Sequence, residues 1–167
     1  MSRTQSEIDQ LIACPKTVSE PPRKALKADG AHLRNDMKLT STLDGSEFHV
    51  FMRISADFPE NFSIGLRFLP HDGSGVITLL RFNGPHGEFN DHFDPHHPHS
   101  EFHVHKATET AMAAGLKAEK WAERSQEFAS FAEALAAFLR TAAVVDADLY
   151  FGDYLQPRLP FQEEAVP

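Results

Sequence analysis

The chain is predicted to be a single α+β domain, in which a five-stranded antiparallel meander sheet carries an N-terminal helix and C-terminal helices packed on one face. Three observations predict this class. Hydrophobic and polar residues alternate through much of residues 31–106, helical periodicity is confined to the segments before and after, and turn signals join the strand-like runs. The length of 167 residues and the 41% hydrophobic composition suit one domain, 1–167, with a substantial core.

The N-terminal helix is expected within residues 1–14. Thr4 and Glu7 have the spacing of a capping box, and one apolar stripe follows at Ile8, Leu11 and Ile12. Pro15 stops the helix. Residues 16–30 contain two adjacent prolines and show no periodicity, so they are predicted to be an extended connector.

Five segments are predicted to be strands, at residues 31–39, 48–54, 62–68, 76–82 and 101–106. The first three alternate clearly, and the fourth is uniformly apolar, which favours a central place in the sheet. In the fifth, Phe102 and Val104 are expected to face the core. Because side chains alternate along a strand, His103 and His105 are then directed to the opposite face, which the helices leave open.

Helices are predicted within residues 108–143. Thr108 is a plausible N-cap for the first, and Gly115 ends it. Ser130 and Glu133 form a second capping box, followed by an apolar stripe at Phe131, Leu135, Phe138 and Leu139. This stripe is expected to cover the sheet.

Residues 146–167 are rich in aromatic side chains and interrupted by Pro157 and Pro160. This composition predicts a tail that lies across the body of the domain or reaches another subunit. In the second case the protein would be a homo-oligomer.

The charge balance limits the partners that the chain can bind. Sixteen basic and twenty-four acidic side chains give a formal net charge of −8, so the molecule as a whole repels nucleic acid and anionic membranes. Any polyanion must therefore meet a local basic patch. The single cysteine, the absence of a secretory pattern at the start and the lack of a long apolar run favour a cytoplasmic protein without a membrane partner.

Histidines are concentrated in residues 81–105, which hold seven of the ten in the chain. The middle of this stretch is a long irregular loop, 83–100, and loops of this length are usually functional or disordered. Prolines separate the inner histidines, so we expect His92, His96, His97 and His99 to splay into solvent. The borders of the loop are anchored on strands and are the better candidates for a site.

The first functional interpretation is an acid–base site on the open face. The candidate catalytic residues are His86, His103 and His105, and the candidate anion-binding residues are Arg81, Asn83, Arg53 and Arg67. Histidines exchange protons near neutral pH and arginines bind phosphate through paired donors. Such a set suits metal-independent cleavage of RNA and requires no cofactor. The simpler interpretation is a solvated basic sheet surface.

The second interpretation is a metal site. His103 and His105 lie two residues apart on a strand and thus on one side of it, and His86 or His49 could complete a set of three nitrogen ligands. The ion would be zinc or another transition metal. In this interpretation the protein is a non-enzymatic metal-binding or protein-interaction module.

Several motifs resemble those of an uncharacterised group of bacterial domain proteins of similar length. They are FSIGL at 62–66, LLRFNGPH at 79–86, HVHKAT at 103–108, Gly115 and SFAEALAAFL at 130–139. The segment from Arg81 to His86 also resembles TumE-type toxin–antitoxin proteins, which carry an arginine, an aromatic residue, Asp or Asn, and Pro-His in that order. This second resemblance implies a toxin-like protein that acts on RNA or DNA and has a cognate antitoxin as partner. The net negative charge departs from that expectation.

Overall fold

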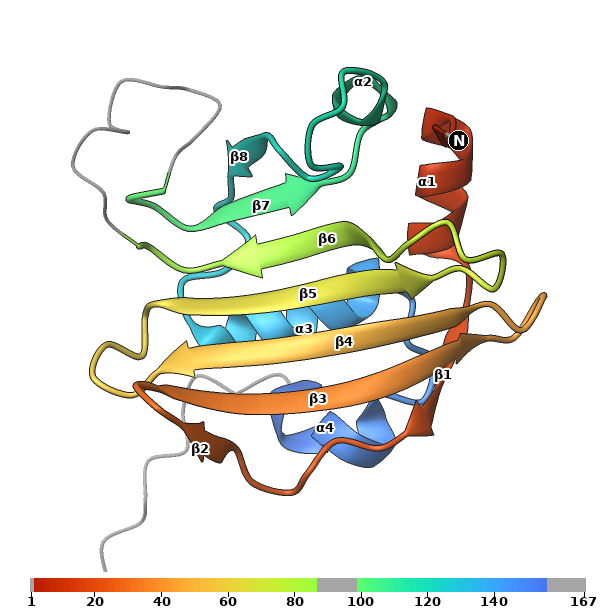
Figure 1. The fold of residues 1–167 in the computed structure, drawn as a ribbon. Helices are drawn as coiled ribbons and strands as arrows, with labels where there is room; N and C mark the ends of the chain where they lie inside the picture. The colour runs from red at the N-terminus through yellow and green to blue at the C-terminus, as the bar shows by residue number, and fades with distance from the viewer. Residues whose placement is uncertain (1, 87–98, 156–167) are drawn as a thin grey trace, which may run out of the picture.

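The structure is a computed structural model that describes residues 2–86 and 99–155. Within these ranges the chain forms eight strands and four helices (Figure 1). In chain order they are α1 Gln5–Ala13, β1 Lys16–Glu20, β2 Lys27–Asp29, β3 His32–Ser41, β4 Glu47–Ser55, β5 Phe62–Leu69, β6 Ile77–Asn83, β7 His103–Lys106, α2 Glu109–Ala113, β8 Ala122–Arg124, α3 Phe131–Thr141 and α4 Asp148–Leu155.

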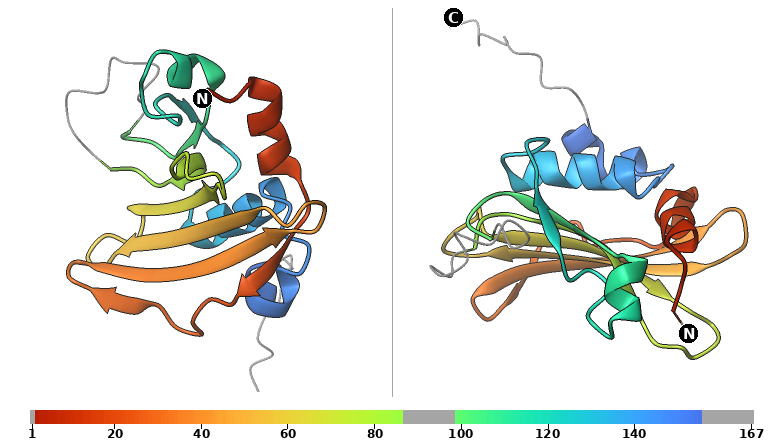
Figure 2. Two further views of the ribbon diagram at one scale, coloured as in Figure 1. Left: turned by 45° about the vertical axis from the view of Figure 1, so that its right-hand side comes forward. Right: turned by 90° about the horizontal axis from the view of Figure 1, so that it is seen from above.

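All eight strands belong to one antiparallel sheet in the order β1-β3-β4-β5-β6-β7-β8, and the short β2 also pairs with β3. Helices α3 and α4 lie on one face of the sheet (Figure 2). The predicted α+β class is therefore confirmed. The predicted number of five strands was wrong, because β1 and β2 lie within the segment 16–30 that was interpreted as a connector, and β8 is only three residues long.

The core fills the space between the sheet and α3. Alternate side chains of β4 and β5 are buried on this side, including Phe48, Val50, Met52, Phe62, Ile64 and Leu66. From β6, the ring of Phe82 packs edge-on against Phe138 of α3, with centroids 5.6 Å apart. This contact fixes which face of β6 looks toward the helices, and Arg81 and Asn83 therefore lie on the other face.

Both long helices begin as their sequences predict. Thr4 and Glu7 form a complete capping box at α1. At α3 the Ser130 hydroxyl accepts a hydrogen bond from the backbone N–H of Glu133, but the Glu133 carboxylate binds the N–H of Ala129, 2.7 Å away, rather than that of Ser130. The motif therefore caps the helix, but its second hydrogen bond reaches one residue further back than in a standard capping box.

Lys16, on the edge strand β1, forms hydrogen bonds with the C-terminal ends of two helices. Its side chain is fully buried, and its ammonium group donates hydrogen bonds to the carbonyl oxygens of Ile12, Cys14 and Ala142 at 2.8, 2.8 and 3.0 Å. These carbonyls lie at the C-terminal ends of α1 and α3, where backbone acceptors lack helical partners. One cation therefore satisfies both helix ends, although burial lowers the pKa of its ammonium group.

The face opposite α3 is partly covered by its own side chains. The ring of Phe51 lies against Gly65 on the neighbouring strand, where a Cβ atom would come within 2.2 Å of that ring. The guanidinium groups of Arg53 and Arg67 stand 5.7 and 4.5 Å from the ring centroid. Phe51, Arg53 and Arg67 lie on the face opposite α3, as the strand alternation predicts. Because they pack on one another, this face of the sheet is less open than expected.

The predicted tail, 146–167, begins with a helix. Within it, α4 packs on α3 and buries Phe151. Residues 156–167 lie outside the described residues, so an intersubunit role for them stays a prediction. None of the helices in the described ranges is long and apolar enough to cross a membrane.

Candidate metal centre

The site lies on the face away from α3, where β6 pairs with β7. The register sets Arg81 opposite His105 and Asn83 opposite His103, so the four side chains share one face of the sheet. The two borders of the long loop, which are separated by many residues in sequence, therefore meet in space.

The turn after β6 holds His86 against this strand pair. The Gly84 N–H donates to the carbonyl oxygen of Phe62 at 3.0 Å, and a Cβ atom on Gly84 would collide with the carbonyl oxygen of Glu60. Only glycine permits this approach without a shift of the backbone. The His86 N–H then donates to the carbonyl oxygen of His99 at 2.7 Å, which fixes the two histidines side by side.

Four imidazole rings converge at this point. The ring centroids of His86 and His103 are 5.1 Å apart, those of His86 and His99 are 4.7 Å apart, and those of His103 and His105 are 5.1 Å apart. Ligand nitrogens of His86, His99 and His103 all lie within 4.8 Å of one another. Nitrogens bound to one tetrahedral zinc ion are about 3.3 Å apart, so a small contraction would bring these three into a coordination sphere.

His99 was not among the predicted site residues. It was assigned to the solvated inner run, yet it belongs to the cluster. The antiparallel register of β6 and β7 indicates that His99 lies near His86. Asn83 pairs with His103, so three residues further along the chain position 86 comes opposite position 100, which is next to His99. His92, His96 and His97 of the same run lie outside the described residues.

Backbone carbonyls determine the tautomers of His103 and His105. The Nδ1 atoms of these rings contact the carbonyl oxygens of Glu101 and Glu119 at 2.6 and 3.0 Å. A carbonyl oxygen only accepts, so each Nδ1 carries the proton and each neutral ring presents a lone pair at Nε2. Both Nε2 atoms are buried and have no hydrogen-bond partner among the described residues. Each of the two rings thus has a buried acceptor that no described residue uses.

Burial keeps these two rings neutral. Desolvation is the main cause that lowers the pKa of His103 from 6.5 to about 4; the neighbouring imidazoles and Arg81 act in the same direction, and the hydrogen bond to the Glu101 carbonyl opposes them. Desolvation, Arg81 and His103 lower the pKa of His105 to about 3. At neutral pH both rings are therefore lone-pair donors.

These pKa shifts predict an acid-sensitive fold. In the unfolded chain both histidines take up protons below pH 6.5, whereas the folded protein resists protonation until about pH 4 and 3, so stability falls as the pH falls through this window. The expected loss between pH 7 and 5 is about 2 kcal/mol for each histidine. Urea unfolding with a chelator present measures it. A His103→Asn/His105→Asn double variant should lose about 4 kcal/mol less over this range, and equal pH dependence would contradict the assignment.

Arg81 is the charged group beside the cluster. Burial lowers the pKa of its guanidinium, and its Nε atom is buried without a hydrogen-bond partner among the described residues. Asn83 accepts a hydrogen bond from Ser63 at 2.9 Å, which turns its amide nitrogen toward His86, 3.5 Å away. Both predicted residues thus lie at the site. Arg81 has an Nε–H donor without a partner among the described residues, and Asn83 contacts the ring of His86.

The other predicted residues lie elsewhere on the same face. Arg53 and His49 both contact the carboxylate of Asp36, at 3.4 and 3.0 Å, in a separate pocket. Arg67 stacks on Phe51 between the two places. His49 therefore does not complete the histidine cluster.

Searches against protein-family models, curated proteins and solved structures found no match to this chain.

Proposed function

We propose that this protein binds a transition-metal ion, of which zinc is the first candidate, through His86, His99 and His103. The observation that carries the proposal is the buried Nε2 lone pair of His103, whose ring is oriented by a backbone carbonyl at Nδ1. Histidine ligands of metals are typically held in this way by an acceptor at the second nitrogen. Two further imidazoles in the same place supply the remaining donors.

A metal ion accounts for the cluster better than proton chemistry does. A buried acceptor without a partner costs about 1–3 kcal/mol, and a bound cation would remove this cost for His103. Protonation would instead place charge beside Arg81 in a desolvated site, which is why the pKa values of His103 and His105 are so low. Imidazole ligands suit zinc, copper, iron and nickel.

Three histidine ligands would leave a further coordination position. Sites with three protein ligands and an open position bind water or a ligand there, whereas closed sites with four protein ligands are structural. Beside the trio, Arg81 supplies positive charge, which favours an anionic ligand at the open position. The lone pair of His105 would accept a hydrogen bond only from a ligand that carries a proton.

Metal titration of untagged protein tests the proposal. We expect one equivalent of Co²⁺ to bind and to give visible absorption bands of a four- or five-coordinate site, and Zn²⁺ to displace it in a one-to-one ratio. Elemental analysis of the purified protein gives the native ion. Substoichiometric binding at micromolar concentration, with no visible bands, would sink the proposal.

The metal-independent acid–base interpretation receives less support. It needs one histidine to donate a proton to a leaving group, and at neutral pH neither His103 nor His105 carries that proton. A toxin-like action on RNA and a cognate antitoxin stay predictions from the resemblance. RNA cleavage assays with and without the metal would test them directly.

A further inference from the structure

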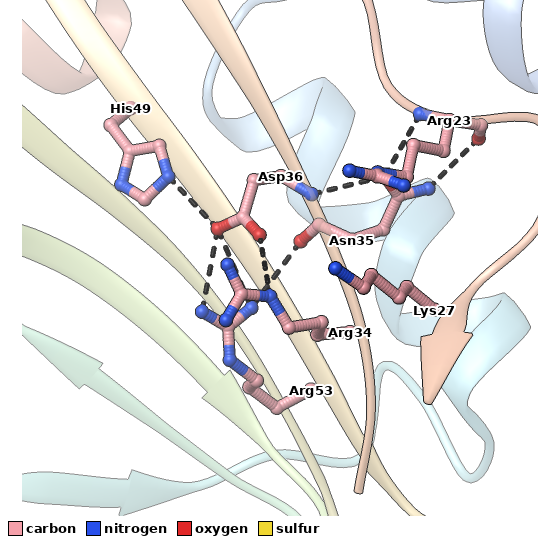
Figure 3. Close-up of a pocket in the computed structure, with 7 residues that line it drawn as sticks. All are labelled: Arg23, Lys27, Arg34, Asn35, Asp36, His49 and Arg53. Carbon is pink, nitrogen blue, oxygen red and sulfur yellow. Dashed lines mark hydrogen bonds and ion pairs between the residues drawn. The ribbon is translucent and has the colours of Figure 1, made fainter. Parts of the chain in front are cut away.

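A second site lies on the same face of the sheet, at the end of β3 and β4 that is near β2. It is a pocket of about 420 Å³, shown in Figure 3, and its walls are lined by Arg23, Lys27, Arg34, Asn35, Asp36, His49 and Arg53. These residues come from three strands and from the segment between β1 and β2. Four of the seven are arginine or lysine, on a chain whose net charge is −8.

Asn35 fixes one wall of the pocket. Its side chain is buried, its Oδ1 atom accepts from the backbone N–H of Arg23 at 2.9 Å, and its Nδ2 atom donates to the carbonyl oxygen of the same residue at 2.9 Å. This two-way clamp attaches the segment before β2 to the sheet. Arg23 is therefore presented on a rigid support.

The strand register aligns like charges. Lys27 of β2 lies opposite Arg34 of β3, which lies opposite Arg53 of β4, so three cations form one row across neighbouring strands. Like charges directly opposite each other destabilise a sheet. A bound anion in the pocket would offset the repulsion between Lys27, Arg34 and Arg53 and would explain why they lie in one row.

The carboxylates present offset only part of this charge. Asp36 contacts Arg34, Arg53 and His49, and Asp29 at the edge contacts Arg34 at 3.2 Å. Within the described ranges, the side-chain nitrogens of Arg23 and Lys27 make no ion pair or hydrogen bond. The four arginine and lysine side chains and the two carboxylates leave a surplus of two positive charges.

We propose that this pocket binds a phosphate group. A terminal phosphate carries close to two negative charges at neutral pH and has three acceptor oxygens, which matches the surplus and the several guanidinium donors. A carboxylate would neutralise only half of that surplus. The proposal uses none of the histidine ligands and is independent of the metal.

Two sources share this chemistry. One is a free phosphomonoester such as a nucleotide, and the other is the backbone of single-stranded nucleic acid, in which two neighbouring phosphodiesters would supply the two negative charges. On the same face, Arg67 and Arg81 continue the positive charge from Arg53 toward the histidine cluster, which gives an extended ligand further contacts. The two sources differ in whether a terminal phosphate is needed, and this difference can be measured.

Binding to the full chain tests the proposal, with inorganic phosphate, a nucleoside 5′-monophosphate and a single-stranded oligonucleotide without a terminal phosphate as probes. We expect saturable shifts of the Arg34 and Arg53 Nε–H NMR signals with at least one probe, and Arg53→Gln should weaken that binding about 10-fold or more. Asp36→Asn should tighten it, because the competing carboxylate charge is removed. A misfolded variant would not bind more tightly, so this opposite effect controls for structural damage.

Arg140→Gln serves as the matched control, since Arg140 is an exposed arginine on α3, on the far side of the sheet. It should leave binding unchanged, as should His103→Asn, which separates this site from the metal centre. Binding of the monophosphate identifies the phosphomonoester as ligand, and binding of the oligonucleotide alone identifies the nucleic-acid backbone. No binding at millimolar concentration, equal weakening by Arg140→Gln, or weakening by Asp36→Asn would each overturn the proposal.

Discussion

Replacing His103 by asparagine is expected to lower the affinity for Zn²⁺ or Co²⁺ by at least about 100-fold, because the lost Nε2 lone pair is central to the proposed ligand set. Asparagine is suited to this test, since its amide can still donate to the Glu101 carbonyl that holds the imidazole. The affinity is measured by competition with a chromophoric chelator at pH 7.

The matched control is His49→Asn, which removes a histidine from the same face of the sheet but from the pocket around Asp36. It should leave the metal affinity within a factor of about 2–3, because its ring does not join the cluster. If both variants bind metal like the wild type, the imidazole cluster is not the ligand set. If both lose it equally, the metal binds histidines without specificity.

Replacing Lys16 by methionine is expected to reduce the free energy of unfolding by about 3 kcal/mol or more. Methionine fills a similar volume but leaves the carbonyl oxygens of Ile12, Cys14 and Ala142 without the donor that now serves all three. Urea unfolding at pH 7, followed by far-ultraviolet circular dichroism, measures the loss.

The control for Lys16 is Lys38→Met, because Lys38 is exposed and forms an ion pair with Glu20 at 2.9 Å. Such surface pairs contribute about 0–1 kcal/mol, so this variant should stay close to the wild type. A loss at Lys16 no larger than that at Lys38 would show that other donors, such as water, replace the ammonium group.

The sequence predicted the parts of the fold where periodicity expresses burial. β3, β4 and β5 alternate because one face is packed under α3, and the capping residues of the helices have their preferred types. β1 could not be recognised in this way. Its most buried residue is Lys16, so its pattern of polar and apolar residues does not follow its pattern of exposure.

The candidate site was predictable where it depends on alternation within a strand. His103 and His105 share a face for that reason, and Arg81 and Asn83 join them through the antiparallel register. Their burial was not predictable, because it depends on how β7, β8 and the loop borders fold over the rings. The role of Asp36 was missed as well, since a single aspartate in an alternating strand is typical of an ordinary solvated face.

The hydrogen bonds of Lys16 also constrain the order in which the protein can form. Lys16 and its acceptor Ala142 are 126 positions apart, so the edge strand and the first helix complete their contacts only after most of the chain has been synthesised. Contacts of such long sequence separation slow folding, because a large loop must close before they contribute. During translation, the hydrogen bond that joins Lys16 to the end of α3 can therefore form only after α3 has been made.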